Sequence, residues 1–288
     1  MFRDGAPKVI APLAIPNDPK EYISIQGQYT KAGALNLIYA SDAEYADFDA
    51  LFSFVFSQTQ NEEIGLYEVP SFTKLHQYLV DREDARYLFG ETCVRCGVPE
   101  TYDDYYSALS KSSRQTIRTS QNRLQSDGKT LDVRFYRGKE HIPLQLLPKV
   151  KRLCENRIRE NDPDAPRPDP EEAKMDLRGF LFFQRNELYR YVRREDGAFC
   201  GVVHIDGQIA AVMIAAQRDG YVIVPTFSHD SRFDRYTPGV LLLNAFFQTF
   251  CGSDLRVMDL SRGNEKYKYR YLCLPEEYHA DHFKIRRS

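Results

Sequence analysis

The chain has 288 residues, of which 42% are hydrophobic and 28% charged, so its composition argues against disordered and fibrous classes. Its 39 Lys and Arg against 41 Asp and Glu give a formal net charge of −2, which argues against binding nucleic acid or an anionic membrane through bulk charge. No window approaches the ~18 apolar residues of a membrane span, and the proline-broken N-terminus fails as a signal peptide. A cytoplasmic location is therefore expected.

The six cysteines are scattered along the chain, which fits a reducing compartment better than a disulfide framework. Cys93 and Cys96 form a single C-x-x-C pair. A zinc site would need two more ligands at a comparable spacing, and the sequence holds no second pair. We interpret both residues as structural thiols and expect no metal.

Strands and helices alternate in the first third of the chain. Apolar residues at helical spacing predict a helix over 42–58, opened by a Ser-Asp cap. The other predicted elements are strands at 35–40, 64–69 and 86–94 and a helix at 71–82. This order predicts an α/β arrangement.

A second α/β run follows a predicted helix over 102–125, which Ser-Asp-Gly at 126–128 ends. Its first elements are a strand at 131–137, a helix at 143–160, a proline-rich loop at 161–170 and a helix at 171–194.

Three strands in close order come next, at 199–205, 208–217 and 221–227. Asp-Gly pairs separate them, and such pairs between apolar runs indicate hairpins. The last predicted elements are a helix at 239–251 and strands at 256–261 and 282–287.

The order of this second run resembles that of the GNAT acyltransferase fold, and three motifs sharpen the resemblance. Residues 105–124 are similar to the "Y-x-x-x-L-S-x-x-x-R" helix of CelD-type proteins of polysaccharide biosynthesis, and residues 236–246 to their Ser-Pro-Gly-x-x-Leu-Leu helix start. Residues 258–271, MDLSRGNEKYKYRY, resemble the "D-F-x-R-G-D-E-x-Y-K-x-R-W" signature of that branch. The resemblance covers roughly residues 30 to 288.

This resemblance implies a tandem GNAT-like α/β architecture with mixed, mostly antiparallel sheets flanked by helices, as in Fem-type transferases. The first half would be a degenerate partner. The domain boundaries that follow are 1–100 for the degenerate half, 101–128 for basic linking helices, and 129–288 for the acyltransferase domain.

The resemblance implies acetyl-CoA or another acyl-CoA as co-substrate. A helix N-terminus suits its pyrophosphate, and the junction before residue 239 supplies one. The pantetheine arm would insert between the strands at 221–227 and 256–261, where Pro225 cannot donate to a ladder. The expected cofactor-binding residues are Arg232, Arg235, Pro238, Gly239, Val240 and Lys268. A generic strand-to-helix connection with solvated arginines is the alternative, because the loop keeps a single glycine.

Acyl transfer to an amine needs a proton acceptor and a donor to the leaving thiolate. Tyr267 stands at the position of the signature tyrosine and is the expected acid. His229 or Asp230, and then Glu265, are the candidate bases, although a histidine in a loop is more often solvated. We interpret His204 as a satisfied core or surface residue.

A basic face on the helix at 102–125 holds Lys111, Arg114 and Arg118 at helical spacing, with Arg123 one turn further. It predicts either a patch for an anionic acceptor or a solvated helix face. Arg114 matches the arginine of the family motif. The expected acceptor-binding residues are Arg114, Arg118, Asp259 and Arg262.

These features predict an acyl-CoA-dependent N-acyltransferase in which an amine attacks directly within a ternary complex. The acceptor would be small and anionic or related to a glycan. One alternative is a Fem-type transferase that takes an aminoacyl group from tRNA, and another is a non-catalytic partner in a biosynthetic complex. The sequence leaves a homodimer open.

Overall fold

The computed structural model of the chain describes residues 1–18, 20–21, 23–25, 37–138, 141–143, 145–146, 149–150, 152–153 and 197–287. They form two compact units. Unit 1 comprises Met1–Cys93, Arg262–Asn264 and Glu277–Ser288, and unit 2 comprises Val94–Ser261 and Glu265–Glu276. The predicted loop at 161–170, the helix at 171–194 and most of the helix at 143–160 lie outside the described residues.

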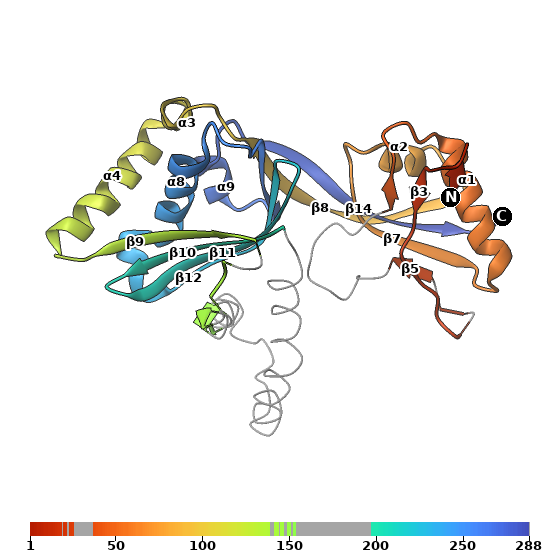
Figure 1. Cartoon of the computed structure of the whole chain (residues 1–288), viewed down its shortest axis with the longest axis horizontal. Helices are drawn as coiled ribbons and strands as arrows, with labels where there is room; N and C mark the ends of the chain where they lie inside the picture. The colour runs from red at the N-terminus through yellow and green to blue at the C-terminus, as the bar shows by residue number, and fades with distance from the viewer. Residues whose placement is uncertain are drawn as a thin grey trace, which may run out of the picture. The chain divides into compact units, whose positions relative to one another are not determined.

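Unit 1 contains a sheet of strands in the order β4-β5-β7-β14-β8, with β5 parallel and β14 antiparallel to β7. Two small pairs, β1 with β2 and β3 with β6, complete its strands. Helices α1 and α2 bury their apolar faces with β7 and β14 in one core (Figure 1). The bounds are β1 Phe2–Arg3, β2 Ala6–Pro7, β3 Val9–Ile10, β4 Leu13–Ala14, β5 Ile23–Ile25, β6 Ile38–Tyr39, α1 Tyr45–Gln58, β7 Glu63–Pro70, α2 Lys74–Val80, β8 Ala85–Gly97 and β14 Glu276–Arg286.

Helix α1 buries Phe48, Leu51 and Phe52, as the spacing predicted. It begins later than the predicted Ser-Asp cap. Glu44 is its N-cap, and the Glu44 and Asp47 side chains form a reciprocal capping box. The sequence placed the cap too early because several polar residues precede the helix.

Unit 2 is built on strands in the order β13-β12-β11-β10-β9, all antiparallel except β13 with β12. The predicted hairpins are confirmed, and Asp206 and Asp219 have φ of +49° in their turns. The bounds are α3 Tyr102–Ala108, α4 Lys111–Ser126, β9 Leu131–Arg137, β10 Ala198–Ile205, β11 Gln208–Arg218, β12 Tyr221–His229, the 3-10 helix η2 Ser231–Tyr236, α8 Pro238–Phe250, β13 Val257–Arg262 and α9 Lys266–Tyr271.

The single helix predicted over 102–125 is wrong, because the chain forms α3 and α4 there. Leu109 is extended, with φ −70° and ψ 146°. Ser110 then starts a new helix, since its hydroxyl accepts a hydrogen bond from the Ser113 amide at 3.1 Å. The two helices can therefore point in different directions.

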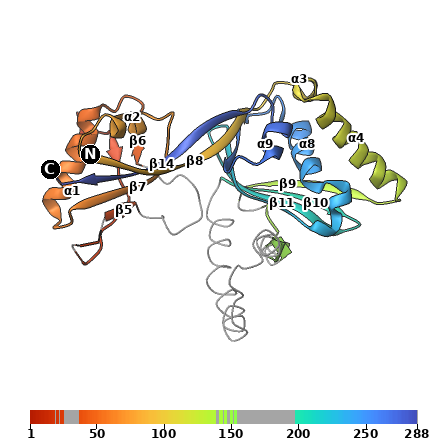
Figure 2. The same ribbon diagram turned by 180° about the vertical axis from the view of Figure 1, so that it is seen from behind.

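Alternate side chains of β10 serve two cores on opposite faces of the unit 2 sheet. Phe199 and Val203 pack with α3, α4 and α8. Cys200 and Val202 pack instead with Leu146 on the other face. Figures 1 and 2 show α3, α4 and α8 on one side of strands β9 to β12. The mixed, mostly antiparallel α/β class predicted from the sequence is confirmed.

Candidate functional site

Strands β12 and β13 are paired over a short stretch and then separate. They are parallel and pair over three positions, from Tyr221 with Val257 to Ile223 with Asp259. No further pairing between them occurs in the part of the chain that the structure describes. Pro225 lies just beyond the last pair, at a bulge in the ladder with β11. Two parallel strands that separate leave backbone groups of both available for a bound ligand.

A buried network holds the end of β13. Asp259 is fully buried, and its Oδ1 accepts a hydrogen bond from the Ser261 amide at 2.7 Å while Oδ2 accepts one from the Tyr221 hydroxyl. Ser261 has φ of +56°, a left-handed conformation. Lys268 is 1% exposed, and its Nζ donates to the Ser261 carbonyl at 3.1 Å and pairs with Glu265 Oε2 at 3.1 Å. Asp259 and Lys268 thus fix the path of the chain at the strand end.

Tyr267 lies in α9 against the separated part of β12. Its ring stacks on Phe227, with 5.7 Å between centroids and 15° between planes. Burial raises the pKa of the Tyr267 phenol well above its usual range, and the negative charge of Glu265 adds to the effect. The phenol therefore stays protonated and can donate a proton.

The N-terminus of α8 follows the same strand. Thr237 is its N-cap in a left-handed conformation, and Pro238 is the first helical residue. Among the described residues no side chain caps this end, and its first turn holds no acid. Gly239 lies beneath Phe227, because a Cβ there would be 3.2 Å from that ring. This helix end offers amides and a positive dipole to an anion.

Helix α4 holds the loop that leads into α8. Ser120 Oγ lies 2.5 Å from Thr237 Oγ1, and Arg123 Nη1 donates to the Arg235 carbonyl at 2.9 Å. The Tyr236 hydroxyl donates to Asp127 Oδ2 at 2.7 Å. Sequence reasoning missed these loop-fixing residues and Phe227, since no local pattern marks a contact between α4 and a loop more than a hundred positions away.

The two loop arginines are both largely exposed. Arg232 pairs with Asp230 at 2.6 Å, and Arg235 with Asp127 at 3.2 Å. Arg232 lowers the pKa of Asp230, so that carboxylate stays ionised. Each guanidinium keeps further N–H groups in its fork that can reach phosphate oxygens.

Two of the candidate bases have partners that fix them. His229 ends β12, and its Nε2 is 2.9 Å from Asp234 Oδ1, so a carboxylate orients the ring. Glu265 precedes α9 and is engaged by Lys268. The structure places His229, Glu265 and Tyr267 on the elements that adjoin the separated strands.

The expected acceptor-binding arginines have different surroundings. Arg114 donates to the Ser107 and Leu109 carbonyls at 3.0 Å each, where α3 ends. Arg118 is exposed on α4. Arg262 belongs to unit 1, where its Nη1 lies 3.1 Å from Glu68 Oε1 and 3.0 Å from Glu91 Oε2. Their contact with an acceptor stays a prediction.

Two kinds of feature are absent from the described residues. No group of three or more His, Cys, Asp or Glu side chains could hold a metal ion there. None of the helices described is long and apolar enough to cross a membrane.

The fold and the site at the separated strands define an acyltransferase. Residues 111–269, more than half of the chain, match the family model of the acetyltransferase (GNAT) domain, and the chain belongs to this family. No curated protein matches the sequence.

Several solved structures are similar over nearly the whole chain. The crystal structure of FemX has a TM-score of 0.59 at 10% identity, covering 100% of this chain and 87% of that one. The C-terminal domain (DUF2156) of a putative lysylphosphatidylglycerol synthetase from Agrobacterium fabrum has a TM-score of 0.57 at 10% identity. The match covers 98% of this chain and 82% of that one. The structure of L-PGS from Bacillus licheniformis has a TM-score of 0.55 at 12% identity, and the match covers 98% of this chain and 82% of that one. At these identities the likeness concerns the fold.

Proposed function

We propose that the protein transfers an acyl group from an acyl-CoA, with acetyl-CoA as the first donor to test, to an amine of a small anionic or glycan-related acceptor. The observation that carries this proposal is the separation of β12 and β13 beside the uncapped N-terminus of α8, where Gly239 lies against Phe227 of β12. A cytoplasmic location and a role in polysaccharide biosynthesis, as in the CelD-type branch, belong to the same proposal.

The residues around α8 fit the CoA moiety. The amide of Gly239 in the first turn would hold the pyrophosphate, with Pro238 setting the helix start. Val240 would line the same site, since its amide donates to the Thr237 carbonyl at 3.0 Å and keeps the first turn closed. Arg232 and Arg235 would bind phosphate oxygens from the loop before it. When bound, the thioester supplies an activated acyl group with a thiolate leaving group. The interrupted β12 and β13 offer free backbone groups to the pantetheine arm.

The proton transfers are assigned to side chains of the chain itself. The protonated phenol of Tyr267 would donate to the departing sulfur, and its stacking on Phe227 holds the ring in place. His229, oriented by Asp234, would take the proton of the attacking amine, with Glu265 as the second candidate. Direct attack in a ternary complex requires no acyl-enzyme.

Calorimetric titration of the full chain with acetyl-CoA, a longer acyl-CoA and free CoA tests this proposal. We expect saturable one-to-one binding. Arg235→Gln should weaken it by about tenfold, because one charge-assisted contact is lost, while Arg218→Gln at the far end of β11 should not change it. Absence of binding for all three ligands would contradict the proposal.

A Fem-type transfer of an aminoacyl group from tRNA is the second candidate. The observation that favours it is the likeness to FemX over 100% of this chain. The formal net charge of −2 does not favour a large tRNA interface. Salt-dependent binding of aminoacyl-tRNA in a gel-shift assay, without any binding of CoA, would select this candidate.

A further inference from the structure

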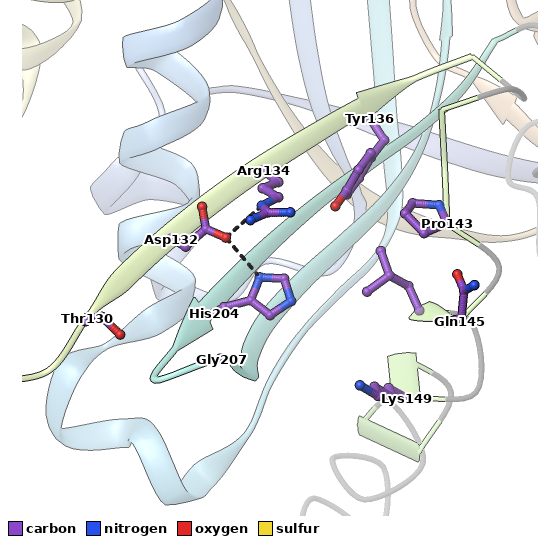
Figure 3. Close-up of a pocket in the computed structure, with 10 residues that line it drawn as sticks. Thr130, Asp132, Arg134, Tyr136, Pro143, Gln145, Lys149, His204 and Gly207 are labelled. Carbon is purple, nitrogen blue, oxygen red and sulfur yellow. Dashed lines mark hydrogen bonds and ion pairs between the residues drawn. The ribbon is translucent and has the colours of Figure 1, made fainter.

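A pocket of about 360 Å³ lies in unit 2 away from the residues assigned to acyl transfer. Strands β9 and β10 form one wall, and Pro143 contributes apolar lining (Figure 3). Leu146 adds to this apolar lining. His204 comes two and four positions after Val202 and Cys200 in β10, so it lies with them on the face of the sheet opposite α8. None of the proposed CoA-binding or catalytic residues lines it.

His204 is held in an unusual way for a half-buried imidazole. It lies opposite Asp132 in the ladder between β9 and β10, and a bulge interrupts the ladder between β10 and β11 next to it. Its Nδ1 is buried and has no hydrogen-bond partner among the described residues, and Asp132 Oδ2 is 3.9 Å away. The expectation of a satisfied histidine is therefore wrong for this atom.

Two permanent cations face the same space as this imidazole. Figure 3 shows the Arg134 guanidinium beside His204 and the Lys149 side chain extending toward the ring. Arg134 Nε lies 2.7 Å from Asp132 Oδ2, and the guanidinium has further N–H groups that can donate to a bound anion. Lys149 has no ion pair with a carboxylate of the described residues. With one acid against two fixed cations, the pocket carries a formal positive charge.

These charges act on His204 from each element that faces it. Burial lowers the pKa of the imidazole, the Asp132 carboxylate opposes this, and Arg134 and Lys149 lower the pKa further. The free ring is therefore mainly neutral near pH 7. An anion in the pocket would raise the pKa of His204, because it offsets the charge of the two cations. It would therefore favour a protonated ring that donates from both nitrogens.

We propose that this pocket binds the phosphate group of a small molecule through Arg134, Lys149 and the protonated His204, at a site separate from α8. Protonated His204 would donate from Nδ1 to Asp132 and from Nε2 to the anion. The volume exceeds the need of a bare phosphate, and Pro143 and Leu146 would contact the remainder of the molecule. The inference goes beyond the proposed acyl transfer and does not depend on it.

Sulfate is the probe for the test, since it is a tetrahedral dianion whose charge is constant in the range used. The full chain, labelled with ¹⁵N, is titrated with sulfate at constant ionic strength while the His204 ring resonances are followed by NMR. We expect a saturable shift and several-fold tighter binding at about pH 6 than at about pH 8, because the bound anion raises the pKa of His204.

Arg134→Gln and Lys149→Gln are exposed substitutions, and each should weaken sulfate binding at His204 by about tenfold. Arg218→Gln removes a cation far from the pocket and should leave the affinity unchanged. Acetyl-CoA binding should be the same in all three variants. The phosphate site and the acyl-CoA site are therefore tested independently, and one can fail without the other. An unshifted His204 ring at about pH 6, or equal affinity in the Arg134 and Lys149 variants and the wild type, would overturn the inference.

Discussion

Tyr267, the proposed acid for thiolate departure, is protonated and held in place. Its phenol is held by stacking on Phe227, and burial keeps it protonated. The neighbouring Lys268 has a structural role instead, since it is almost fully buried and its Nζ donates to the Ser261 carbonyl. Of two adjacent residues in one short helix, Tyr267 is thus the proposed acid and Lys268 a structural support.

Replacing Tyr267 with Phe should reduce kcat by about a hundredfold while acetyl-CoA affinity changes little, because only the proton donor is lost. Steady-state kinetics and calorimetry on the same preparation check this. Since the pKa of the phenol is raised, the wild type should keep this acid protonated above about pH 10, the usual phenol value. Tyr269→Phe in the same helix is the control, and an equal loss there would assign the effect to the helix.

Arg114 is one of the residues expected to bind the acceptor, and its guanidinium donates to the Ser107 and Leu109 carbonyls. Arg114→Ala should lower the free energy of unfolding by about 1 to 2 kcal/mol, because the last carbonyls of α3 lose their donor. Urea denaturation measures this. Arg118→Ala, on the exposed face of α4, should be near neutral. Unchanged stability of the Arg114 variant together with weaker acceptor binding would instead support the predicted role in acceptor binding.

The junction of β12 and α8 joins the elements of the proposed active site. Phe227 on the strand contacts both Gly239 at the helix start and the Tyr267 ring. Helix α4 fixes the loop between them through Ser120 and Arg123. A small change at the helix start is therefore expected to reach Tyr267, the proposed acid.

Gly239→Ala tests this coupling. A Cβ at this position would lie 3.2 Å from Phe227 Cε1, so the ring must shift by a few tenths of an ångström. We expect kcat/KM for acetyl-CoA to fall by about tenfold with a small change in Tm. Gly97→Ala is a matched control, because a Cβ there meets only the Arg256 carbonyl at 4.0 Å. Equal activity in the two variants would argue against a role for this contact.

At the scale of elements, periodicity and turn residues predicted the strands β9 to β13 and helix α8 closely. The Asp-Gly pairs placed both hairpins, because the positive φ they adopt suits this turn. The division of α3 from α4 was not predicted. Leu109 continues the apolar spacing, so only the Ser110 cap, a weaker local signal, marks the break.

At the scale of the whole molecule, the chain returns to unit 1 after completing unit 2. The last strand, β14, lies between β7 and β8 in the order of the sheet, and Phe283 and Ile285 are buried in the unit 1 core. The predicted boundaries, with residues 129–288 as one domain, gave no sign of this return. Such a placement depends on strand pairing between residues about two hundred positions apart.

Ile285→Ala should therefore destabilise unit 1 by about 2 to 5 kcal/mol, although it lies near the C-terminus, because it opens a cavity in that core. Urea unfolding with hydrogen exchange can locate the loss. Ile10→Ala, at a residue 51% exposed, should cost far less. A near-neutral Ile285 variant would contradict the assignment of β14 to the core.

The sequence by itself determined the α/β class, most elements of unit 2 and the family, because hydrophobic period, turn residues and the motif at 258–271 are local signals. Only the tertiary structure decided which side chains serve as supports, such as Asp259 and Lys268, and which meet, such as Phe227 with Tyr267. It also decided that His204 faces Arg134 and Lys149 in a pocket. Burial and partners depend on contacts between distant segments, which no local pattern encodes.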